Sequence, residues 1–94
     1  MKTPALLAIL VSCATLADAG EFDRAIAVLR EVTTKNPANG QARFFLGVTL
    51  VGKAEATRTK SLWDEAIIEL QHAIEQNYDP GLASFYIALS LIHI

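Results

Sequence analysis

The chain has 94 residues, of which 52% are hydrophobic and 19% charged, and its net charge is −2. This composition argues against intrinsic disorder, and the length fits one small domain. Acidic and basic residues are interspersed, so no basic face for nucleic acid is expected. One cysteine cannot form an internal disulfide or a multi-thiolate zinc site. The longest apolar runs fall short of the roughly 20 residues of a transmembrane helix.

The first predicted helix covers residues 4–19. Thr3 is a residue type favoured at the N-cap, and Pro4 fits the first helical position because its missing N–H would have no partner there. Gly20 permits the left-handed backbone that ends many helices. We therefore expect the second helix to begin around residues 21–23.

The second predicted helix is amphipathic. Its apolar residues recur at steps of three and four, which places them on one face: Phe22, Ala25, Ile26, Leu29 and Val32. Charged residues lie mostly on the opposite face, so the helix pairs with the first as a hairpin. Residues 36–40 (NPANG) supply a break, and the third helix is predicted to start near Gln41.

Two later segments share one pattern of small and large apolar residues. Residues 42–50 (ARFFLGVTL) align position for position with residues 83–91 (ASFYIALSL), and residues 22–26 match residues 63–67. Self-similarity of this kind indicates a repeated helical hairpin. We therefore predict an all-α fold, an antiparallel helix-turn-helix repeat solenoid in one domain over residues 1–94.

The predicted solenoid has about two and a half units. The first covers residues 4–39, the second residues 40–80, and a half unit residues 81–94. The second hairpin is lengthened by about two helical turns, which adds about one turn to each helix and preserves the faces. It is predicted to close near residues 59–61, with Ser61 as the N-cap of the next helix.

The spacing of small residues resembles the tetratricopeptide repeat, a helical pair of 34 residues. Cys13 and Gly47 lie 34 positions apart, as the small position of a unit's first helix does. Ala25 follows Cys13 by 12 positions at the small position of the second helix, and Pro37 follows by another 12. The resemblance implies a right-handed superhelix, with close crossings at Cys13 with Ala25 and at Gly47 with Ala66.

In this family the first helices of successive units line a concave groove that binds a partner protein or peptide. Carried over to this chain, the groove residues are Leu10, Ala14, Ala17, Gln41, Phe44, Val48, Val51, Leu82, Phe85 and Leu89. None is charged, so capture of a terminal carboxylate is not expected. The resemblance implies an extended or helical apolar segment packed on Phe44 and Phe85. The alternative is that these rings only pack against neighbouring helices.

Three polar residues depart from the family pattern, because they stand where large apolar side chains are usual: Ser12, Arg43 and Ser84. Looser packing is expected at these positions.

Signals for catalysis or for a cofactor are weak. Glu69 and His72 have the Glu-x-x-His spacing of di-iron bundles, but no second copy of the motif supplies the remaining ligands. Cys13 has no histidine and aspartate motif around it, which favours a packing role. We therefore expect no enzyme activity, no cofactor and no metal.

The N-terminus permits a competing interpretation. Met1 and Lys2, followed by an apolar run that ends in residues 10–13 (LVSC), resemble a bacterial lipoprotein signal in which Cys13 would be lipidated after cleavage. Cleavage there would remove most of the first helix and uncover the apolar face of the second. An uncleaved, unmodified chain would exclude this alternative.

The C-terminal residues 89–94 (LSLIHI) also match the translation of a transposon-end adapter used in DNA libraries. They are therefore either native or read-through into the adapter, which the coding DNA would decide. In both cases the last predicted helix lacks a second-helix partner, so self-association through this helix, or fraying over residues 83–94, is expected.

The sequence thus predicts a non-catalytic scaffold for protein interactions, the N-terminal part of a longer bacterial repeat protein in the cytoplasm. Two alternatives remain. One is a regulatory or docking extension of a larger enzyme, and the other is a lipid-anchored envelope protein modified at Cys13.

Overall fold

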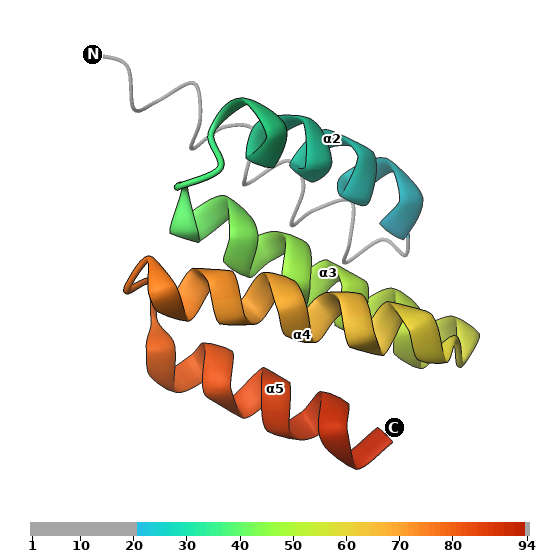
Figure 1. The fold of residues 1–94 in the computed structure, drawn as a ribbon. Helices are drawn as coiled ribbons and strands as arrows, with labels where there is room; N and C mark the ends of the chain where they lie inside the picture. The colour runs from blue at the N-terminus through green and yellow to red at the C-terminus, as the bar shows by residue number, and fades with distance from the viewer. Residues whose placement is uncertain (1–20, 94) are drawn as a thin grey trace.

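The computed structural model describes residues 21–93, which form four helices and contain no β-strand (Figure 1). The helices are α2 (Phe22–Lys35), α3 (Gly40–Thr57), α4 (Lys60–Glu75) and α5 (Pro80–His93). The prediction of an all-α fold is confirmed for this part of the chain. The predicted helix over residues 4–19 lies outside the described residues, as do Leu10, Cys13, Ala14 and Ala17.

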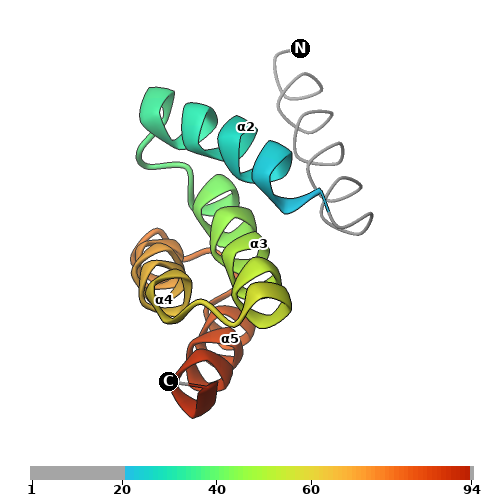
Figure 2. The same ribbon diagram turned by 90° about the vertical axis from the view of Figure 1, so that its right-hand side faces the viewer.

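Consecutive helices run in alternating directions and are joined by short connections (Figure 1). Helix α3 contacts α2, α4 and α5, and α4 also packs against α5. Figure 2 shows α2 on one side of α3, with α4 and α5 on the other side. Helix α3 is therefore the centre of the described part, whereas α5 lies at its edge.

The predicted apolar face of α2 is buried in the structure. Ala25, Ile26, Leu29 and Val32 are all shielded from solvent, as the three- and four-residue spacing predicts. The helix ends at Lys35, and the N–H of Asn36 still donates to the carbonyl of Val32 at 2.8 Å. The predicted break is thus confirmed over residues 36–39, whereas Gly40 already belongs to the next helix.

Helix α3 begins at Gly40, one residue before the predicted start. Its N-cap is Asn39, whose side-chain oxygen accepts a hydrogen bond from the N–H of Ala42 at 3.0 Å. This bond satisfies one of the backbone donors that a helix start leaves without a partner. The boundary is therefore set by local hydrogen bonding.

In the lengthened hairpin, the N-cap of α4 lies two residues before the predicted one. Arg58 adopts the left-handed conformation (φ 55°), and Thr59 occupies the N-cap position of α4. The prediction that Ser61 caps the helix is wrong, because the chain has already reversed and Ser61 lies in the first turn of α4. Thr59 makes no capping bond, and its hydroxyl lies 2.8 Å from that of Thr57.

The predicted close crossing at Gly47 is confirmed. A Cβ placed on Gly47 would lie 2.6 Å from Cγ of Leu70 and 3.4 Å from the carbonyl oxygen of Ala66. A side chain at this position would collide with Leu70 unless Leu70 or α4 shifted, so glycine lets the two helices approach. Leu70 and Ala66 are fully buried in this interface. The corresponding crossing of Ala25 with Cys13 cannot be compared, because Cys13 lies outside the described residues.

Candidate partner-binding surface on helix α5

The structure separates the predicted groove residues into buried and exposed ones. Phe44 is only 6% exposed, and its ring centroid lies 5.4 Å from that of Tyr78 and 6.1 Å from that of Tyr86. Val51 is also buried. The assignment of Phe44 and Val51 to an open groove is therefore corrected, because both belong to the buried core. Phe44 is covered by Tyr78 of the α4–α5 connection and by Tyr86 of α5.

The other described groove residues keep some access to solvent. Gln41 and Val48 are half-buried, and Val48 packs against the core. Leu82 is 42% exposed and Phe85 59%. Leu89 is half-buried.

The exposed ring of Phe85 packs against a second aromatic ring. Its ring meets that of Tyr86 edge to face, with 5.6 Å between the ring centroids, and Tyr86 in turn contacts the buried Phe44. Edge-to-face pairs are favourable arrangements of aromatic rings. The exposed phenyl ring is therefore held by a chain of aromatic contacts that leads into the core.

The outward side of α5 carries further exposed residues that the predicted groove did not include. They recur at steps of three and four and therefore share one face with Phe85: Gly81, Ser84, Ala88, Leu91 and Ile92. This set, together with Phe85, is called the outer face of α5 below. The spacing of three and four residues could have grouped these positions on one face, but it does not distinguish an exposed face from a buried one.

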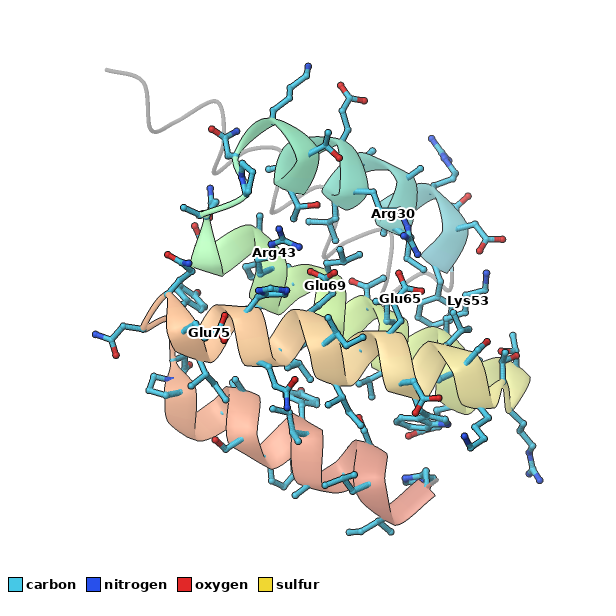
Figure 3. The ribbon with its side chains drawn as sticks, viewed as in Figure 1. Arg30, Arg43, Lys53, Glu65, Glu69 and Glu75 are labelled. Carbon is cyan, nitrogen blue, oxygen red and sulfur yellow. The ribbon has the colours of Figure 1, made fainter. Side chains whose placement is uncertain are left out.

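No charged side chain of the aspartate, glutamate, lysine or arginine type occurs in α5. The charged residues that connect helices lie elsewhere. Arg43 of α3 points toward Glu69 of α4, with 2.8 Å between Nη1 and Oε1, and Arg30 of α2 pairs with Glu65 of α4 (Figure 3). The surface of α5 therefore lacks these four residue types, whereas the ion pairs of α4 with α2 and α3 use them.

Looser packing was expected at Arg43, but the structure shows an ion pair there. The side chains of Arg43 and Glu69 are only 18% and 13% exposed. Nδ1 of His72, the other residue of the Glu-x-x-His spacing, lies 3.3 Å from Oε1 of Glu75. Within residues 21–93, no group of three or more histidine, cysteine, aspartate and glutamate side chains is placed to hold a metal ion.

A cavity of about 460 Å³ lies at the end of the α3–α4 hairpin. It is lined by Ala54, Glu55, Arg58, Lys60, Trp63 and His93. The rings of Trp63 and His93 stack there, with centroids 4.7 Å apart and an interplanar angle of 12°. This lining offers an aromatic wall and charges of both signs, but no hydroxyl or thiol for nucleophilic chemistry.

Comparisons of the chain with protein-family models, with curated proteins and with solved structures find no match. Among residues 21–93, none of the helices combines the length and the apolar character that crossing a bilayer would require.

Proposed function

We propose that the chain is a non-catalytic scaffold for protein interactions, built from helical hairpins of the tetratricopeptide type. It binds an apolar peptide or helix in the groove that the first helices of its units line. The observation that carries the proposal is the exposure of Leu82 and Phe85, two large apolar side chains of that groove, on α5.

The repeat character of the scaffold is supported by three features. Two nine-residue segments align along the chain, the helices alternate in direction, and Gly47 brings α3 against α4 where the spacing requires a small residue. These features together are typical of stacked helical hairpins, in which each unit buries its apolar face against its neighbours.

The energetics favour Leu82 and Phe85 as contact residues. Covering the exposed part of each side chain contributes about 1 kcal/mol from apolar burial. Since Phe85 already rests on Tyr86, a partner loses little conformational entropy when it orders this ring. A partner segment with two or three large apolar side chains therefore fits this site better than a charged one.

A peptide selection tests the proposal. A library of displayed peptides is screened against the full chain, and the affinity of a selected peptide is then measured for Leu82→Ala and Phe85→Ala. We expect Phe85→Ala to weaken binding about tenfold or more, and Leu82→Ala somewhat less.

Ile68→Ala is the matched control, because Ile68 is 52% exposed but belongs to α4. Its affinity should equal that of the unchanged chain. If no peptide is selected, or if Leu82→Ala and Phe85→Ala both bind as well as the control, the groove is not the binding site and the proposal fails.

A further inference from the structure

The connection between α2 and α3 ends in an asparagine followed directly by a glycine, Asn39 and Gly40. In such a pair the backbone nitrogen of the glycine can attack the side-chain carbonyl carbon of the asparagine, because glycine has no Cβ that would block the approach. Solvent base removes the proton of the Gly40 N–H, the bond from this nitrogen to Cγ forms, and the bond from Cγ to Nδ2 breaks. The departing amide group takes a proton from water and leaves as ammonia, so Asn39 becomes part of a five-membered cyclic imide.

Water can open this imide in two ways. Attack at Cγ breaks the bond from Cγ to the Gly40 nitrogen and leaves an aspartate in an ordinary backbone. Attack at the backbone carbonyl carbon breaks the original peptide bond and leaves a β-aspartyl linkage, in which the main chain runs through Cγ and gains one atom. The two products have the same mass, but only the first keeps the backbone of the original chain.

The fold holds the two reacting atoms of Asn39 and Gly40 apart. The side-chain oxygen of Asn39 accepts the N–H of Ala42 at 3.0 Å, which fixes this side chain at the first turn of α3. With ψ of Asn39 at 95°, its Cβ and the nitrogen of Gly40 lie on nearly opposite sides of the Cα–C bond, whereas the imide ring requires them on the same side. Ring closure therefore requires the start of α3 to open.

The backbone of this pair is also held in place by its surroundings. Gly40 is buried, and a Cβ placed on it would lie 2.8 Å from Cβ of Gln76 and 2.9 Å from Cβ of Tyr78. The backbone carbonyl of Asn39 accepts the N–H of Arg43 at 3.1 Å. The start of α3 thus has neither the space nor the unpaired backbone groups that a rearranged main chain would need.

We propose that Asn39 and Gly40 form a deamidation site that the folded chain keeps closed, and that the β-aspartyl product of an opened chain cannot rebuild the start of α3. Aspartate is as good an N-cap as asparagine, and its charge is favourable at a helix N-terminus, so the first product keeps the cap. The β-aspartyl product displaces Gly40 by one atom and turns the carbonyl that accepts from Arg43 into a carboxylate outside the main chain. This inference concerns the lifetime of the fold and does not depend on the proposed binding function.

The test incubates the full chain in mildly alkaline buffer, once folded and once unfolded in guanidinium chloride, and follows the mass gain of amide-to-acid conversion at each asparagine by peptide mapping. We expect conversion at Asn39 to be at least about tenfold slower in the folded chain, because the reaction passes only through a rarely populated open form. Asn77 is the internal control, because the side chain of Tyr78 hinders attack by the following nitrogen. It should convert slowly in both samples.

The aged, unfolded sample is then returned to native buffer beside Asn39→Ser, which keeps a capping side chain but has no amide to lose. Chains with aspartate at position 39 and the Asn39→Ser chain should regain the denaturation midpoints of their fresh samples, whereas β-aspartyl chains should unfold at a lower denaturant concentration. Equal conversion of Asn39 in the folded and unfolded samples would overturn the proposal, as would no conversion in either. β-Aspartyl chains that regain the midpoint of the fresh chain would show that the start of α3 accepts the extra atom, which also overturns it.

Discussion

Helices α3 and α5 have nearly the same pattern of residues but very different surroundings. Ala42 and Ala83 are both fully buried at matching positions. Phe44, by contrast, is 6% exposed while its counterpart Phe85 is 59% exposed. One side is therefore buried in both helices, whereas the other side is buried in α3 and exposed in α5.

The difference arises from the neighbours of each helix. Helix α3 packs between α2 and α4, whereas α5 packs against α4 and only slightly against α3. An apolar pattern states which residues favour burial, but burial itself requires a second surface in contact. The same side chain is thus a core residue in α3 and an available contact in α5.

Substituting the two matched phenylalanines should give the largest difference. Phe44→Ala removes a buried ring that contacts Tyr78 and Tyr86, and we expect it to lower the free energy of unfolding by about 3–5 kcal/mol. Phe85→Ala should lower it by less than about 1 kcal/mol. Urea unfolding followed by circular dichroism measures both. Equal losses would mean that the outer face of α5 is covered in solution.

The matched glycines should respond in opposite directions. Gly40→Ala places a methyl group 2.8 Å from Cβ of Gln76 and 2.9 Å from Cβ of Tyr78, atoms that cannot move without the backbone, and should cost about 1–3 kcal/mol. Gly81→Ala meets no atom of the other elements in residues 21–93 within 4 Å and should stabilise the chain by about 0.5 kcal/mol through its higher helix propensity. The shift of the thermal midpoint distinguishes the two signs, and a destabilising Gly81→Ala would contradict the open face.

The ion pair at the α3–α4 seam has no equivalent at the outer face, where Ser84 replaces Arg43. A double-mutant cycle with Arg43→Ala and Glu69→Ala should give a coupling energy of about 1–2 kcal/mol, because both side chains are largely shielded from water. The same cycle on Lys35 and Glu31, which are 72% and 69% exposed, should give about 0.5 kcal/mol or less. Similar couplings for the two pairs would indicate that the first is solvated.

The smallest change in stability is expected at Thr49 and Ser90, two matching positions that are buried in both α3 and α5. The hydroxyl of Thr49 donates to the carbonyl of Phe45, and that of Ser90 donates to the carbonyl of Tyr86, both at 2.8 Å. Each hydroxyl bonds a carbonyl within its own helix and so joins no two elements. Ser90→Ala and Thr49→Ala should therefore each lower the free energy of unfolding by about 1 kcal/mol or less. Chemical denaturation again measures it, and a large loss at only one position would show that the two sites are not equivalent.

Much of the fold could be predicted from local features of the sequence. The buried face of α2, the break before α3 and the close approach at Gly47 all follow from the spacing of apolar and small residues. The cap of α4 could not be predicted in the same way. Serine at position 61 and threonine at position 59 are both acceptable N-caps, and the left-handed turn at Arg58 selected Thr59.

The candidate surface was predicted only in part. Leu82 and Phe85 are exposed as the groove assignment requires, whereas Phe44 and Val51 are buried. Their residue types gave no means of separating them, because a phenylalanine that binds a partner and one that fills a core have the same hydrophobicity.

The amino-acid pattern alone therefore determined that the chain is helical, where its helices break and which side of each helix is apolar. The tertiary arrangement decided which of those apolar sides are covered. Periodicity and capping act within a few residues along the chain, whereas the exposure of Phe85 and the burial of Phe44 depend on whether a neighbouring helix lies against that face.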